Sequence, residues 1–251
     1  MSTSDRWYER FFDGLYGQVL GSRRFEKPAA SEAALIKRLL RLRRGQHVLD
    51  CPCGLGRIAR QLTALGLNVT GADLSASYIR RARRRAGRRG LKVRFLRCDM
   101  RELPFDREFH AVVNWFTSFG YFDEAGNLAA ARAAFSALRP GGRFLIEMTN
   151  KSWLRGRFTP RGDETMGGVR IIRHSRWDRQ GRRVINTWIF SKGRRREVHR
   201  FSHYLYTAGQ LRALLRQAGF RDIRFYGWRR FGRLTRHSRR MIAIARRPGR
   251  V

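Results

Sequence analysis

Residues 48–59 read V-L-D-C-P-C-G-L-G-R-I-A, and this stretch decides the fold. It begins with two apolar residues that are typical of the end of a buried strand. Gly54 and Gly56 then permit a tight turn in which bare backbone can approach a ligand closely. A helical pattern opens at Ile58. A strand, a glycine-rich turn and a helix in this order indicate a nucleotide-binding unit, because the turn and the first helical amides face the ligand.

Strand-like and helix-like segments alternate on both sides of this unit. We expect strands at 46–51, 68–73, 92–97, 110–115 and 143–148, and helices at 56–65, 75–87 and 125–138. Strands separated by helices predict a parallel sheet with helices on both faces. Two further helices precede it, an aromatic one at 5–20 and one at 31–43 that Ser31 would cap.

The alternation of strand-like and helix-like segments ends after residue 150. Three consecutive strands are expected at 168–177, 182–191 and 195–206, and their turn-like connections predict an antiparallel insertion. A helix at 207–218 and strands at 220–227 and 240–246 follow. The predicted fold is therefore α/β: a Rossmann-like, seven-stranded, mostly parallel sheet with helices on both faces and an antiparallel β insertion after the fifth strand.

Polar side chains stand at the ends of four of the expected strands. They are Asp50, Asp73, Asp99 and Asn114. Because the carboxyl ends of parallel strands meet at one edge of a sheet, these residues predict one shared ligand site. For Asp73, capping of the helix that follows Ser75 is a competing role.

The type of nucleotide follows from the order of the motifs. The pattern G-L-G-R-I-A at 54–59 matches the dinucleotide fingerprint, which is weak alone. Asp50 on the strand itself and the sequence L-R-P-G-G at 138–142 point elsewhere. In this order of motifs the chain resembles the class I S-adenosylmethionine-dependent methyltransferases, closely over 45–150 and more loosely beyond. A nicotinamide enzyme ranks last.

The resemblance implies S-adenosyl-L-methionine as the cofactor and a role for each motif. The loop from Asp50 to Gly56 would hold the methionine end, and Asp73 would hold the ribose. Residues 99 and 100 would border the adenine. The implied cofactor-binding set is Asp50, Cys51, Gly54, Gly56, Asp73, Leu74, Asp99, Met100 and Asn114. The family usually has glycine where this chain has Pro52, which removes one amide donor from the loop.

The resemblance also divides the chain into four parts. Residues 1–44 would form N-terminal helices that cover the cofactor cleft, and 45–150 the cofactor-binding core. Residues 151–206 would form the β insertion as a substrate lid. Residues 207–251 would supply the C-terminal helix and the last two strands of the core sheet.

The acceptor side is less sharply marked. The segment 115–122, W-F-T-S-F-G-Y-F, could stack a base, surround a cationic amine or simply pack the loop. The aromatic N-terminal helix and the strand-rich insertion are loosely similar to small-molecule N-methyltransferases, which implies Tyr16 near the methyl group. His203 could deprotonate an acceptor, or be a hydrogen-bonded strand histidine. The catalytic candidates are Tyr16, Asn114 and His203.

Charge favours anionic partners. The chain of 251 residues has 55 Lys and Arg against 19 Asp and Glu, a formal net charge of +36. Such a surface attracts polyanions, so weak, non-specific binding of RNA is expected. The bases are spread over every segment, which argues against a dedicated nucleic-acid site.

Several classes of protein are disfavoured. No run approaches 18 apolar residues, so no membrane span is expected, and the first ten residues lack a signal peptide's apolar stretch. The three cysteines, at 51, 53 and 98, suit reduced thiols and a cytoplasmic location. No second Cys/His pair has zinc spacing, so no metal is expected.

The leading hypothesis is a methyltransferase that acts on a small molecule by in-line methyl transfer. The first alternative is an RNA or ribosome methyltransferase, which charge alone favours. The second alternative is a non-catalytic basic binding protein with the same fold.

Overall fold

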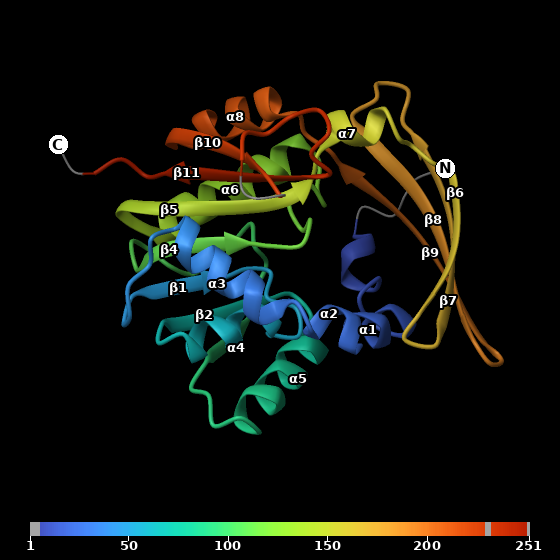
Figure 1. Cartoon of the computed structure of the whole chain (residues 1–251), viewed down its shortest axis with the longest axis horizontal. Coiled ribbons are helices and arrows are strands. Elements are labelled where there is room, and N and C mark those ends of the chain that lie inside the picture. The colour runs from blue at the N-terminus through green and yellow to red at the C-terminus, as the bar shows by residue number, and fades with distance from the viewer. Residues whose placement is uncertain (1–5, 229–231, 250–251) are drawn as a thin grey trace.

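The computed structural model has two β-sheets, and the N-terminal helices lie between the end of the larger sheet and the smaller sheet (Figure 1). The structure describes residues 6–228 and 232–249. The outer ends of the first and last expected segments, residues 1–5 and 250–251, lie outside the described residues. Within the described residues, no helix is long and apolar enough to cross a membrane.

The larger sheet has the seven strands expected from the sequence. Its order is β10-β11-β5-β4-β1-β2-β3, parallel except for β11, which runs antiparallel to both β5 and β10. The strands are β1 (His47–Asp50), β2 (Asn68–Asp73), β3 (Arg94–Arg97), β4 (Phe109–Asn114), β5 (Leu138–Thr149), β10 (Arg221–Gly227) and β11 (Arg240–Arg246). The prediction of a Rossmann-like, mostly parallel sheet is confirmed.

Helices cover both faces of this sheet, which explains why its strands are apolar on both sides. On one face lie α3 (Ala29–Leu39), α4 (Arg57–Ala64) and α5 (Ala76–Gly87); on the other lie α6 (Glu124–Ala137) and α8 (Ala208–Gln217) (Figure 1). Val113 packs into the first layer and Val112 into the second, as the alternation of a strand requires.

The smaller sheet is the expected antiparallel insertion, with one more strand than predicted. It follows β5 and the short helix α7 (Lys151–Arg155). Its strands are β6 (Arg161–Met166), β7 (Val169–Trp177), β8 (Arg183–Lys192) and β9 (Arg195–Tyr204), paired in that order. We missed β6 because it is an edge strand whose residues, R-G-D-E-T-M, show little apolar alternation.

The N-terminal segment differs most from expectation. The single helix predicted at 5–20 is divided into a 3-10 helix, η1 (Trp7–Glu9), and α1 (Leu15–Leu20), with α2 (Arg23–Glu26) beyond. Gly14 separates them, because its φ of 88° is incompatible with a continuous helix. The prediction that Ser31 caps the next helix is wrong. That helix begins at Ala29, and the Ser31 hydroxyl donates to the Pro28 carbonyl instead.

Candidate functional site

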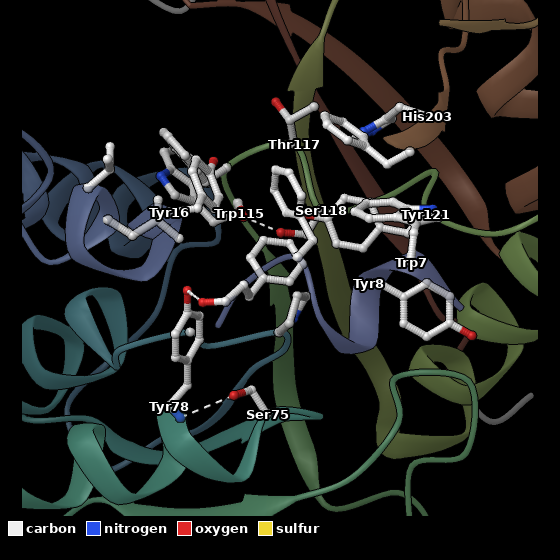
Figure 2. A pocket seen from close by; sticks show the side chains of 18 of the residues that line it. Trp7, Tyr8, Tyr16, Ser75, Tyr78, Trp115, Thr117, Ser118, Tyr121 and His203 are labelled. Carbon is white, nitrogen blue, oxygen red and sulfur yellow. Dashed lines mark hydrogen bonds between the residues drawn. The ribbon is translucent and has the colours of Figure 1, made fainter. Parts of the chain in front are cut away.

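One large cavity, of about 1210 Å³, lies where the carboxyl edge of the core sheet meets the N-terminal segment and the smaller sheet. Pockets for a single drug-sized ligand usually measure roughly 300–1,000 Å³. This cavity therefore has room for two small molecules side by side. Figure 2 shows side chains from separate elements around one space, with Tyr16 from α1, Tyr78 from α5 and His203 from β9.

Asp50 ends β1 and lies in the cavity wall with 2% of its surface exposed. Its Oδ2 accepts a hydrogen bond from the Ala59 amide in the first turn of α4, at 3.0 Å. Burial raises the pKa of this carboxyl to about 7, although the charge of Arg57 and the Ala59 amide favour the ionised form. A cationic ligand beside Asp50 would therefore stabilise a carboxylate that burial destabilises.

The two glycines of the turn have different surroundings. Both have positive φ, 54° at Gly54 and 70° at Gly56. Gly54 lines the cavity, and a Cβ there would meet no other atom within 4 Å. A Cβ on Gly56 would lie 2.8 Å from the ring of Phe95. Gly56, expected to touch the ligand, instead allows α4 to pack against the sheet and does not line the cavity.

Asp73 ends β2 and fixes the glycine turn. Its Oδ2 accepts from the Gly54 amide at 2.8 Å, and its Oδ1 accepts from the Ser75 amide at 2.9 Å. Burial raises the pKa of Asp73 to about 6 against those two bonds. The cap of α5 is Ser75, whose hydroxyl accepts from the Tyr78 amide. Asp73 and its neighbour Leu74 both line the cavity, so the carboxylate remains available to a ligand.

Asp99 lines the cavity beside Met100 and forms an ion pair with Arg101, with 2.7 Å between Oδ2 and Nη2. The Arg101 guanidinium lies 4.3 Å from the centroid of Phe122 and also donates to the Tyr8 hydroxyl at 3.2 Å. This network connects the third acid of the site to the N-terminal segment. Sequence reasoning did not anticipate it.

Asn114 does not line the large cavity. It is 2% exposed, and its Nδ2 lies 3.7 Å from the Met100 sulfur. It borders a separate void of about 10 Å³ behind Met100 and Cys51. Cys51 borders both spaces. The expectation that Asn114 faces the reactive centre therefore disagrees with its position one layer behind the wall.

A strained turn follows β4. Phe116 and Thr117 have φ of 68° and 57°, rare values for two consecutive residues other than glycine. Buried Glu147 holds them: its carboxylate accepts from the Phe116 amide and its carbonyl from the Thr117 amide, each at 2.9 Å. Arg240 pairs with the same carboxylate. Sequence reasoning missed Glu147, although it is the only acid in the apolar run 144–148.

Aromatic rings of the N-terminal segment and the smaller sheet line one side of the cavity. This aromatic wall consists of Trp7, Phe11, Tyr16, Trp188 and Phe201. Ring centroids are 5.0 Å apart for Trp7 and Phe201, 5.2 Å for Trp188 and Phe201, and 4.6 Å for Phe11 and Tyr16. Burial raises the pKa of Tyr16 to about 12, so its hydroxyl stays protonated at neutral pH. Of these rings only Tyr16 was among the site residues expected from the sequence.

The smaller sheet also fixes the start of α1. Oε2 of Glu197 accepts from the Leu15 amide at 3.0 Å, and Gly14 leaves room for that carboxylate. The N-cap residue of α1 is Gly14, which has no side chain to cap the helix. Glu197 on β9 therefore sets the position of the segment that carries Tyr16.

His203, on β9, lines the cavity. Its Nε2 lies 3.2 Å from the Phe119 carbonyl, which can only accept, so Nε2 carries the proton. Burial lowers the pKa of His203 to about 4 despite this bond. The imidazole is therefore neutral near pH 7, and Nδ1 is left as an acceptor.

Comparison with known proteins agrees with this geometry. A family profile described as a methyltransferase domain matches residues 48–142, the segment that carries the glycine turn and the three acids. Over residues 48–142 the chain is similar to the class I S-adenosylmethionine-dependent methyltransferases. The match ends before the smaller sheet begins.

Two curated relatives align with parts of this chain. A demethylmenaquinone methyltransferase of Thermus thermophilus is 38% identical over 104 residues, which is 40% of this chain and 46% of that protein. A dTDP-3-amino-3,4,6-trideoxy-alpha-D-glucopyranose N,N-dimethyltransferase of Streptomyces venezuelae is 35% identical over 124 residues, covering 48% and 51%. The chain spans about half the length of these relatives.

Solved structures extend the likeness in fold over nearly the whole chain. The amino pentose methyltransferase CalS10 of Micromonospora echinaspora, solved with S-adenosylmethionine bound, has a TM-score of 0.67 and 26% identity, covering 94% of this chain and 99% of that one. An S-adenosylmethionine-dependent methyltransferase from Clostridium acetobutylicum has a TM-score of 0.78 at 16% identity, covering 96% and 98%. These likenesses include the smaller sheet as well as the core.

Proposed function

We propose that this chain transfers a methyl group from S-adenosyl-L-methionine to a small-molecule acceptor held beneath the smaller sheet. The observation that carries the proposal is the single cavity shared by Asp50, Asp73 and Asp99 with the aromatic wall. The relatives are named as enzymes acting on quinones and amino sugars. Neither RNA methylation nor a purely binding role gains support from them.

The residues present suit this cofactor. Asp50 would face the ammonium of its methionine end, and the turn at Gly54 leaves the space that a close ligand needs. Asp73 would accept from the ribose hydroxyls with lone pairs that the Gly54 and Ser75 amides leave unused. Leu74 and Met100 would border the adenine. Asp99 would accept a hydrogen bond from the amino group of the adenine. Cys51 would pack behind the sulfur.

Bound S-adenosylmethionine supplies a methyl group activated on a sulfonium, so the protein's main contribution is to position the acceptor. We infer an amine acceptor. Its nucleophilic nitrogen becomes cationic on methylation, and aromatic faces attract such a charge. Tyr16 and its neighbouring rings would orient that nitrogen.

His203 would accept a hydrogen bond from the acceptor at Nδ1. It would be a poor general base, because a group with a pKa of about 4 holds a proton weakly at neutral pH. The amine would therefore have to arrive uncharged. Asn114 would act indirectly, by positioning Met100 from behind.

We propose that residues 45–150 form the cofactor-binding core and that residues 1–44 cover its cleft. Residues 151–206 would form a lid over the acceptor, and residues 207–251 would supply the last helix and the last two strands of the core sheet. The three cysteines are free thiols, which supports a cytoplasmic location. RNA binding would be weak and blind to sequence.

The test is methyl transfer from labelled cofactor to a panel of small amines and to RNA, at low salt and at about 200 mM salt, where binding by counterion release is largely lost. We expect labelled small-molecule product at both salt concentrations. Label in one RNA position, lost in parallel with RNA binding as salt rises, would replace this proposal with the RNA enzyme.

A further inference from the structure

The cavity has two chemically different ends. It follows the carboxyl edge of the core sheet, along which the strands run β2, β1, β4, β5 and β11. Asp73 ends β2, and Arg240 begins β11 opposite Thr149, the last residue of β5. Four strand spacings, about 19 Å, separate these two positions. The carboxylates of the cofactor side therefore lie far from the arginines at the other end.

Two of the arginines at this end are neutralised. Arg240 pairs with buried Glu147, and Arg173 on β7 pairs with Glu164 at 3.0 Å. Arg239 also lines the cavity, but no carboxylate forms an ion pair with it within residues 6–228 and 232–249. This end of the cavity therefore has an uncompensated positive charge.

A second arginine, Arg157, does not line the cavity but lies beside Trp153, which does. The Arg239 guanidinium lies 5.6 Å from the ring centroid of Trp153, and the Arg157 guanidinium lies 5.9 Å from the same centroid. Arg157 likewise has no ion pair in the described part of the chain. An anion beside Trp153 would be attracted by the charge of each arginine. Guanidinium groups match the paired oxygens of phosphate and carboxylate.

We propose that the methyl acceptor carries an oxyanion group, a phosphate or a carboxylate, which binds to Arg239 beside Trp153, where the charge of Arg157 adds to the attraction. This inference rests on the proposed function and specifies its substrate class.

The test is calorimetric titration of the full chain with inorganic pyrophosphate and, separately, with malonate, at about 150 mM salt, where surface charges are screened beyond about 8 Å. The double variant Arg157→Gln/Arg239→Gln is compared with Arg84→Gln/Arg88→Gln at the C-terminal end of α5. Both lose two charges, and Arg84 and Arg88 are exposed. We expect at least one anion to bind, and its affinity should be about tenfold or more weaker in the Arg157/Arg239 variant. In the α5 variant the change should stay below about twofold.

The anion that binds more tightly identifies the group as phosphate-like or carboxylate-like. Equal weakening in the two double variants, or binding of neither anion to the wild-type chain, would overturn the inference. S-adenosylmethionine is titrated into the same three proteins, and all three should bind it equally. Failure of the wild-type chain to bind it would count against the proposed function and leave the result for the anion site unaffected.

Discussion

The carboxyl edge of the core sheet and the inner face of the smaller sheet meet in one cavity but are built differently. At the core edge, acids are fixed by bonds to nearby backbone, such as the amides of Gly54 and Ser75 on Asp73. On the smaller sheet, the wall consists of rings from distant segments, such as Trp7 against Phe201. The family match covers the first region and stops before the second. The two regions therefore differ in how their walls are held: by bonds to local backbone at the core edge, and by contacts between segments remote in sequence at the smaller sheet.

The largest expected effect is on the core edge. Asp73→Ala would remove the proposed charge-assisted contact of this buried carboxylate with the ribose, worth about 1.5–3 kcal/mol. S-adenosylmethionine should then bind about ten- to a hundredfold or more weakly by calorimetry. Thermal unfolding checks that the variant is folded. Unchanged affinity in a folded variant would remove Asp73 from the site.

The two glycines sharpen the contrast between ligand space and packing. In each, alanine must adopt a left-handed conformation at about 1–2 kcal/mol, but only at Gly56 does the new Cβ overlap Phe95. Gly56→Ala should therefore lower Tm by more degrees than Gly54→Ala. Gly54→Ala should weaken cofactor binding more than Gly56→Ala does, relative to the stability that each variant loses. The reverse pattern would mean that the cavity wall has been misassigned.

On the smaller sheet, the test is the contact that positions Tyr16. Glu197→Ala leaves the Leu15 amide without its acceptor, a loss comparable to that of a helix cap at about 0.5–2 kcal/mol. The KM for the acceptor should rise a few-fold, while cofactor affinity stays unchanged. Asp163→Ala breaks an exposed ion pair with Arg170 on the same sheet and should change neither value. A matching loss of cofactor affinity in Glu197→Ala would contradict the division between the two regions.

The smallest expected effect is the release of a fraction of a proton when the cofactor binds. Burial raises the pKa of Asp50 to about 7, so the free protein holds about half a proton there at pH 7. A cofactor ammonium favours the carboxylate, lowers this pKa and releases that proton. Calorimetry at pH 7 in buffers of different ionisation enthalpy should show the release, which should fade as pH rises above 8. Asp50→Asn should abolish it. Release of equal size in that variant would assign the proton to another group.

The sequence predicted the core edge well because its signals are local. A strand end, a glycine turn and a helix start occupy twelve consecutive residues, 48–59, and each acid follows its own strand. The errors there concern direction rather than position. Gly56 and Asn114 stand where expected along the chain, but one faces Phe95 and the other lies behind Met100. Motif spacing does not reveal which side of a wall a residue occupies.

The smaller sheet was harder to predict because its contacts are remote in sequence. Trp7 meets Phe201, and Glu197 meets Leu15, across nearly the length of the chain. The sheet's existence followed from its turns, but its edge strand β6 has too little apolar alternation to be recognised. Gly14, which divides the expected N-terminal helix, leaves room for Glu197, a partner 183 positions later that no local pattern indicates.

The most direct test is a crystal structure with S-adenosylhomocysteine. We predict that this ligand lies in the cavity between the two sheets, with its ribose on Asp73, its amino acid end toward Asp50 and its sulfur directed at the aromatic wall around Tyr16. A ligand bound elsewhere, or with its sulfur directed away from the smaller sheet, would contradict the claim that donor and acceptor meet there.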